Sequence, residues 1–271
     1  MRSARPRALQ ENPRPFAPSV RSQLYLYGIT SAITPQQLLP LGPGVGDPPR
    51  GVTAMVHKDI TALVSEVGQM PADSRDVRSL RKDLRAHAAL IERAAEHMTI
   101  LPARYGLVFP SVEALRRELL EPQYAAIQAL LAKLKGAIEL TLRATYIEEP
   151  LLRQIASNDP SLASPGSRDS YQSRIETGKR IAAAIEVHRE EDARFLVKRL
   201  TPVRDIRINK PSGELMVLNA SLLVERAKLP TFDRQLATLQ AEIGDFIKLD
   251  CVGPLPPYSF VDLRVTSQSR R

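Results

Sequence analysis

Alternation of apolar and polar residues is the clearest pattern along this chain. From Ile138 to Tyr146 every second residue is apolar or aromatic, and the residues between them are charged or carry hydroxyls. Successive side chains of a strand point to opposite faces of a sheet, so this pattern predicts a half-buried strand. Shorter apolar segments predict further strands at 23–29, on both sides of Lys58–Asp59, within 99–109, on both sides of the turn 210–213, and at 246–253.

Other segments have the three- and four-residue apolar spacing of helices. We expect helices from about residue 76, after Ser111, from Pro122, over 151–156, over 170–200 and through the segment 232–246. The first of these places five apolar residues on one face, which we expect to be buried: Val77, Leu80, Leu84, Ala88 and Ile91. Away from that face lies a basic stripe of Arg75, Arg78, Lys82 and Arg85. This stripe is either a solvated surface or a docking surface for an acidic partner.

These elements predict an α+β protein with two domains, because both halves combine hairpins with helices that cover one face of a sheet. We place the domains at residues 23–146 and 147–262, each with a small, largely antiparallel sheet. Residues 1–22 form a basic, Pro-rich arm that we expect to be disordered, and residues 263–271 form a basic tail.

Composition and charge narrow the function classes. Hydrophobic residues make up 43% and charged residues 25% of the 271 residues, which is typical of a globular protein. Five arginines against one glutamate in residues 1–22, and three against one aspartate in 262–271, account for most of the net charge of +8. A nearly neutral body argues against a dedicated nucleic-acid binder.

We also expect neither a membrane span nor export. The chain has no apolar run of about 18 residues and no apolar signal segment near its start. Its single cysteine, Cys251, cannot form an internal disulfide, which agrees with a cytoplasmic protein.

The sequence has few signs of a catalytic, metal or cofactor site. The glycines of 42–46 suggest a phosphate loop, but Asp47-Pro48-Pro49 follows where a helix and a Lys-Ser/Thr pair would be needed. The four histidines lack metal-ligand spacing. His188 lies on an apolar stripe of its helix, so we expect it to be a hydrogen-bonded residue of the protein core. We therefore expect no metal and no cofactor.

Three segments resemble the GvpL/GvpF family of gas vesicle proteins: YLYGI at 25–29, LPARYGLVF at 101–109 and GPLPPYSFV at 253–261. The resemblance extends in order from Gln23 to Val261, although Leu255 stands where that family commonly has tryptophan. These segments supply the candidate partner-binding or motif residues, which are Tyr25, Tyr27, Gly28, Arg104, Tyr105, Gly106, Phe109, Pro256, Pro257, Tyr258 and Phe260.

The resemblance implies two α+β domains related to ferredoxin-like folds and an accessory protein of gas vesicle formation without catalytic activity. It implies the hydrophobic shell protein as partner, together with other accessory proteins, and a location at the gas vesicle and in the cytoplasm. Two alternatives stay open: an enzyme whose site combines His87, Arg104 and Tyr105, and a scaffold-binding module that uses its basic tails.

Two motifs carry structural expectations of their own. Arg104 stands between apolar segments, so we expect its guanidinium to pair with a carboxylate or carbonyls and to fix a kink at Gly106. Three prolines within 253–261 predict an extended connector that crosses the domain boundary and buries Phe260.

Overall fold

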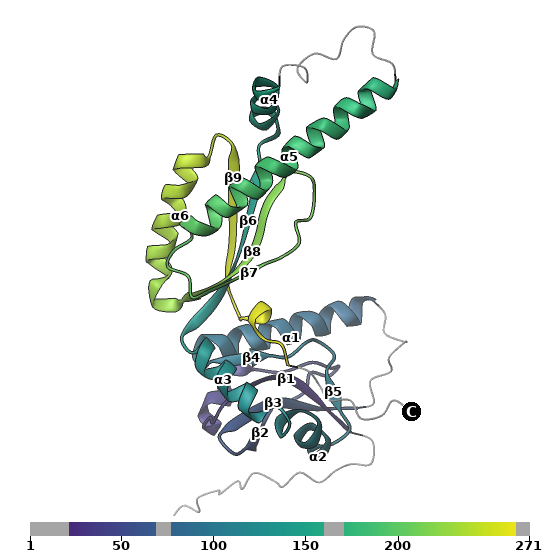
Figure 1. The fold of residues 1–271 in the computed structure, drawn as a ribbon. Coiled ribbons are helices and arrows are strands. Elements are labelled where there is room, and N and C mark those ends of the chain that lie inside the picture. The colour runs from purple at the N-terminus through teal and green to yellow at the C-terminus, as the bar shows by residue number, and fades with distance from the viewer. Residues whose placement is uncertain (1–21, 69–76, 160–170, 264–271) are drawn as a thin grey trace, which may run out of the picture.

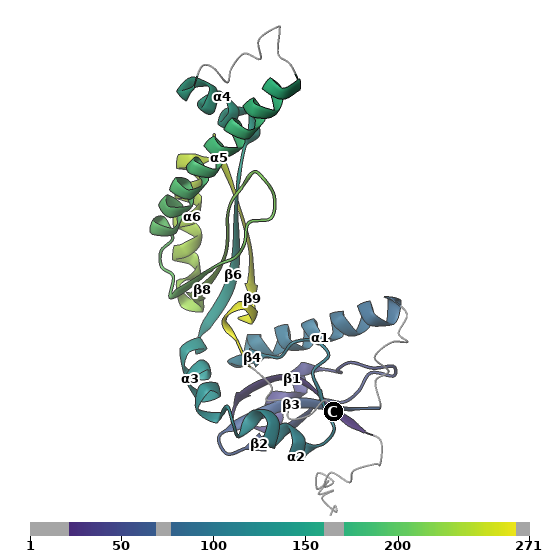
Figure 2. The same cartoon turned by 45° about the vertical axis from the view of Figure 1, so that its right-hand side comes forward.

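The computed structural model describes residues 22–68, 77–159 and 171–263. The predicted arm and tail lie outside the described residues, apart from Ser22 and Leu263. Figures 1 and 2 show two units placed end to end, each with its own sheet. The α+β fold class predicted from the sequence is confirmed.

The first sheet is antiparallel throughout. Its main strands run in the order β2-β3-β1-β4, and β5 also pairs with β1. The predicted hairpin at Lys58–Asp59 is confirmed, and Lys58 has a positive φ of 55° in its turn. The strands are β1 (Gln23–Ser31), β2 (Thr53–His57), β3 (Ile60–Val67), β4 (Ile100–Pro102) and β5 (Val108–Phe109).

Helices cover both faces of this sheet, not one face as expected. One face packs against α1 (Val77–His97) and the 3-10 helix η1 (Pro35–Leu41). The other face packs against α2 (Val112–Leu115), the π-helix η2 (Arg116–Leu120) and α3 (Tyr124–Leu134). Alternate side chains of β1 point into these two clusters, so β1 lies at the centre of the unit.

The buried face of α1 differs from the predicted one. Val77, Leu80 and Leu84 are exposed, and the buried residues are Asp83, His87, Leu90, Ile91 and Ala94. Only the C-terminal half of the predicted stripe reaches the sheet. Asp83 is buried because its carboxylate accepts a hydrogen bond from the backbone N–H of Gly46, at 3.0 Å.

The second sheet has the order β7-β8-β6-β9 and is also antiparallel. Its connectivity, β-α-β-β-α-β, is that of a ferredoxin-like fold, whereas the first unit has three strands before its long helix. The elements are β6 (Ala137–Tyr146), α4 (Glu148–Asn158), α5 (Tyr171–Arg199), β7 (Asp205–Ile208), β8 (Met216–Glu225), the 3-10 helix η4 (Arg226–Lys228), α6 (Leu229–Ile243) and β9 (Ile247–Leu255).

Helices α5 and α6 cover one face of this sheet, as Figure 1 shows. Leu196, near the C-terminal end of α5, and Leu200, directly after it, are buried, whereas Phe195 is 38% exposed. His188, expected in the core, is only half-buried on the same helix. The sequence located α5 correctly, but it placed His188 deeper in the core than the structure does.

Strand β6 belongs to the second sheet, where it pairs with β8 and β9. A boundary after residue 146, as expected from the sequence, would separate this strand from both of its partners. We therefore propose that the domains divide at the turn Lys135–Gly136, directly before β6. Gly136 has a positive φ of 67° there.

The end of the described chain is only partly the extended connector that its prolines predict, because a strand and a 3-10 helix form part of it. Strand β9 continues through Pro254 to Leu255, which pairs with Glu139 across a register shift. Pro254 fits there because β9 is an edge strand and a shifted register needs fewer N–H donors. The 3-10 helix η5 (Tyr258–Phe260) follows and leads the chain back to the first unit.

Candidate functional site

The first two sequence motifs meet in one buried aromatic cluster. Tyr25 and Tyr27 are completely buried, and their ring centroids are 4.9 Å apart. The ring of Tyr105 lies edge-on to Tyr25 at 6.1 Å and to His87 at 5.7 Å. The cluster joins β1, α1 and the loop between β4 and β5.

Hydrogen bonds fix the protonation state of His87 in this cluster. Its Nε2 lies 3.2 Å from the carbonyl oxygen of Ala103, which can only accept, so Nε2 carries the hydrogen. Its Nδ1 then accepts from the hydroxyl of Tyr25 at 2.9 Å. Burial lowers the pKa of His87 and raises that of Tyr25, so both side chains remain neutral near pH 7.

Tyr27 organises the glycine-rich loop beside β1. Its hydroxyl accepts from the N–H of Val45 at 2.8 Å and donates to Ser65 at 3.0 Å. A Cβ on Gly44 would lie 1.9 Å from that hydroxyl, so only glycine fits. The suspected phosphate loop is thus filled by side chains of the protein, because Tyr27 and Asp83 accept from its N–H groups.

Gly28 has a packing role. A Cβ at this position would lie 2.7 Å from the carbonyl oxygen of Leu101 and 2.8 Å from the side chain of Ile100. The glycine lets β1 and β4 approach closely at the register shift that follows Leu26.

The expectation that Arg104 pairs and fixes the kink is wrong. Arg104 is exposed and forms no hydrogen bond or ion pair with the described part of the chain. The kink at Gly106, whose φ is 82°, is held instead by its N–H, which donates to the hydroxyl of Tyr25 at 3.2 Å. Because Arg104 follows the last residue pair of β4, its side chain can point outward.

The third motif is anchored on the open face of the second sheet. Ser259 donates from its backbone N–H and its hydroxyl to the carboxylate of Glu139, at 2.8 and 2.6 Å. The hydroxyl of Ser221 donates to that of Ser259 at 2.9 Å. Glu139 is only 3% exposed, so these charge-assisted bonds compensate for the burial of its charge.

Phe260 connects the two units. Its side chain is completely buried in the cluster that contains Phe109 and residues of β1, β3, α2 and α3. Leu223 of β8 belongs to the same cluster, and the guanidinium of Arg207 on β7 lies 5.4 Å from the ring centroid. The prediction that this segment returns across the boundary and buries Phe260 is confirmed.

The other residues of the third motif differ in exposure. Pro256 and Pro257 are buried, and they border a hollow between the two units. Tyr258 is 41% exposed, yet desolvation of its hydroxyl and the charge of Glu92 raise its pKa to about 12. Tyr258 is therefore neutral near pH 7 and lies partly exposed at the junction.

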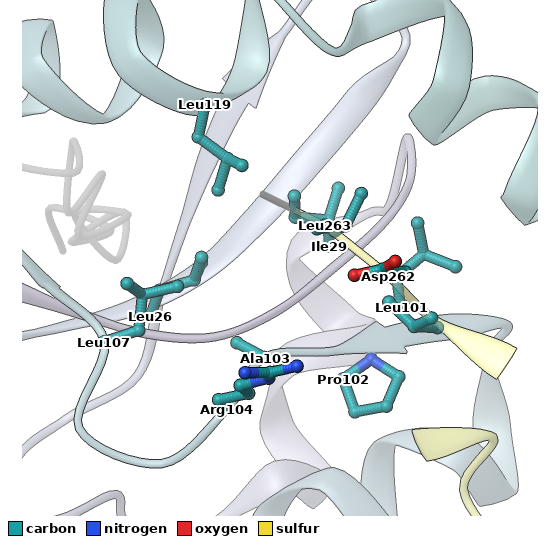
Figure 3. A pocket seen from close by; sticks show the side chains of 11 residues that line it. Leu26, Ile29, Leu101, Pro102, Ala103, Arg104, Leu107, Leu119, Asp262 and Leu263 are labelled. Atoms are coloured by element: carbon teal, nitrogen blue, oxygen red, sulfur yellow. The ribbon is translucent and has the colours of Figure 1, made fainter. Parts of the chain in front are cut away.

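A cavity of about 490 Å³ lies where the second motif meets the end of the third (Figure 3). Its walls are mainly aliphatic, and Arg104 and Asp262 supply its charged groups. The cavity combines residues from β1, β4, η2 and the chain that follows η5, so the sequence spacing did not reveal it. The lining residues are Leu26, Ile29, Leu101, Pro102, Ala103, Arg104, Leu107, Leu119, Val261, Asp262 and Leu263.

The cavity beside Arg104 is suited to binding an apolar group next to the guanidinium of that residue. Within residues 22–68, 77–159 and 171–263, no group of three or more His, Cys, Asp or Glu residues could hold a metal ion. In the same ranges, no helix combines the length and the hydropathy that crossing a membrane requires.

The fold and its junction define a two-domain α+β protein whose three sequence motifs all contribute to the first core or its link to the second sheet. Residues 23–262 match the model of the family described as gas vesicle synthesis protein GvpL/GvpF. The chain belongs to this family, whose members take part in gas vesicle formation.

Individual relatives agree with this assignment. Gas vesicle protein F of Streptomyces sp. (strain CB03234) is 31% identical over 245 residues, which cover 88% of this chain and 99% of the relative. The crystal structure of GvpF from Anabaena sp. PCC7120 has a TM-score of 0.75 at 24% identity, covering 90% of this chain and 99% of that one. GvpF from Microcystis aeruginosa gives a TM-score of 0.68 at 23% identity, with 89% and 99% covered. These two crystal structures support the fold.

Proposed function

We propose that this chain is a non-catalytic accessory protein that binds the hydrophobic gas vesicle shell protein during assembly. It would act in the cytoplasm and at the growing vesicle, and it would also contact other accessory proteins. A shell subunit that exposes apolar surface before assembly aggregates unless another protein covers that surface.

The cavity beside Arg104 is the observation that supports this proposal best. Aliphatic walls accept an apolar side chain, and a few charged groups at the same site fix its orientation. Two of the family motifs contribute to it, the second through Leu101 to Arg104 and Leu107, and the third through Val261. We infer that these motifs present the cavity to the shell protein.

The alternative of an enzyme built on His87, Arg104 and Tyr105 has less support. His87 and Tyr105 lie together, but both ring nitrogens of His87 contact groups of the protein itself. Arg104 is exposed on a different surface, beside the cavity. The basic tails, on which a scaffold-binding module would depend, lie outside the described residues.

Co-purification tests the proposal. The tagged chain is co-expressed with the shell protein of the same organism, and we expect the shell protein to be retained. Arg104→Glu and Leu263→Ser should reduce retention, because both residues line the cavity and neither is fully buried.

Two matched variants serve as controls: Arg143→Glu on the second sheet and Val187→Ser on α5, both exposed and far from the cavity in the fold. Equal retention by all four variants would show that the cavity is not the binding site. Failure of the wild-type chain to retain the shell protein would contradict the proposed function itself.

A further inference from the structure

The N-terminal half of α1 presents an apolar surface that no described element covers. Val77, Leu80 and Leu84 are 63, 38 and 41% exposed, whereas Leu90 and Ile91 in the other half are completely buried. Toward its N-terminal end, no other described helix or strand lies along the upper side of α1 in either view (Figures 1 and 2). The buried residues of α1 begin only at Asp83.

The exposed residues form one ridge. At 100° per residue, Val77, Leu80 and Leu84 lie within about 60° of each other around the helix and extend over about 10 Å along its axis. A ridge with this spacing fits the groove of a second helix. Exposed apolar residues gathered in one ridge indicate a contact surface more strongly than scattered ones.

Positive charge lies directly beside the ridge. Arg81 and Arg85 are exposed, and neither forms an ion pair or hydrogen bond with the described part of the chain. Lys82, further around the helix, is 3.3 Å from the carboxylate of Asp47. The two arginines are therefore available to carboxylates of a partner.

The chain's own undescribed segments are poor candidates for covering this surface. Residues 1–21 contain five arginines and one glutamate, and residues 264–271 contain three arginines and no acid. Both segments would be repelled by Arg81 and Arg85. Residues 69–76 contain two aspartates but few large apolar residues.

We propose that the N-terminal half of α1 is a docking surface for an acidic amphipathic helix of a partner protein. The apolar stripe of that helix packs on Val77, Leu80 and Leu84, and its flanking carboxylates pair with Arg81 and Arg85. This surface contains none of the residues that line the cavity beside Arg104. The inference therefore goes beyond the proposed function and does not depend on it.

A designed peptide of about 18 residues tests this surface, with leucine at helical a and d positions and glutamate beside them. A second peptide keeps every leucine and replaces each glutamate with lysine. Fluorescence anisotropy with the full chain should show binding of the acidic peptide that weakens as salt is added, and at least about tenfold weaker binding of the basic peptide. Hydrogen exchange should show protection by the acidic peptide within 77–88.

Surface variants locate the contact. Arg81→Glu/Arg85→Glu and Leu80→Ser/Leu84→Ser should each weaken binding at least about tenfold, and they should fold normally because all four residues are exposed. Lys179→Glu/Lys210→Glu, which changes two exposed lysines of the second unit, should bind like the wild type.

Three results would overturn the inference. The first is equal affinity of the chain for the two peptides. The second is that the acidic peptide slows hydrogen exchange only outside residues 77–88. The third is that the acidic peptide does not bind at concentrations up to about 1 mM.

Discussion

Replacing Phe260 with alanine should destabilise the protein by about 3 kcal/mol and loosen the link between its two units. The phenyl ring is completely buried between residues of the first core and Leu223 of β8. Because the ring contacts residues of both units, this substitution tests the clamp directly.

The magnitude follows from the buried area. Losing roughly 150 Å² of apolar contact at about 25 cal/mol per Å² amounts to about 4 kcal/mol. Measured Phe→Ala costs in protein cores are about 3–5 kcal/mol. We expect the lower end, because Val261 and Leu263 line the cavity and can relax into part of it when the ring is removed.

Urea unfolding followed by circular dichroism measures this loss. With a slope of about 3 kcal/mol per M, the midpoint should fall by about 1 M, and the single transition should begin to separate into two as the units uncouple. Phe246→Ala is the matched control: Phe246 is 42% exposed, so its truncation should cost less than about 1.5 kcal/mol. An unchanged midpoint for Phe260→Ala, together with lost binding of the shell protein, would mean that the segment is a recognition tail and not a clamp.

Three further predictions concern buried polar groups. Glu139→Gln should cost about 1.5–3 kcal/mol in urea unfolding, because it weakens the charge-assisted bonds to Ser259, and a cost near zero would contradict the anchoring role. Burial lowers the folded-state pKa of His87 below 6.5, so the unfolded chain binds more protons at acid pH and the free energy of unfolding should fall below about pH 6.5. In His87→Gln this dependence on pH should be weaker, and an identical dependence would refute the assignment of a neutral His87. Burial raises the pKa of the Cys251 thiol to about 11, so iodoacetamide at pH 8 should alkylate it more than about tenfold faster after unfolding in urea; equal rates would show that the thiol is not shielded.

Local patterns predicted the elements whose signals lie within a few residues. The alternation in 138–146 identified β6, and the turn at Lys58–Asp59 identified a hairpin. The helix expected after Ser111 is α2, and the side chain of Ser111 caps it by accepting from the N–H of Ala114 at 3.2 Å. Each of these features depends on backbone geometry that neighbouring residues set by themselves.

Features that depend on distant partners were missed. Asp83 and His87 are buried on α1 because Gly46 and Tyr25, far away in sequence, satisfy their polar atoms. The helical period finds an apolar stripe but not which part of it packs against the sheet, so Leu80 and Leu84 were expected to be buried but are exposed.

The candidate site, too, was predicted only where neighbouring residues determine its features. The three motifs were recognised in the sequence, and the burial of Phe260 was predicted from its prolines and aromatic residues. The cavity was not, because its walls come from separate elements that only the fold brings together. The apolar neighbours of Arg104 suggested that it would be buried and paired, but it follows the end of β4 and is exposed beside the cavity.

Light scattering of the shell protein tests the central claim most directly. The shell protein of the same organism is diluted from denaturant into buffer with or without an equimolar amount of this chain. Our account predicts that the chain suppresses the rise in scattering, that Arg104→Glu suppresses it less, and that Arg143→Glu suppresses it as well as the wild type. Scattering that rises equally with and without the chain would contradict the account.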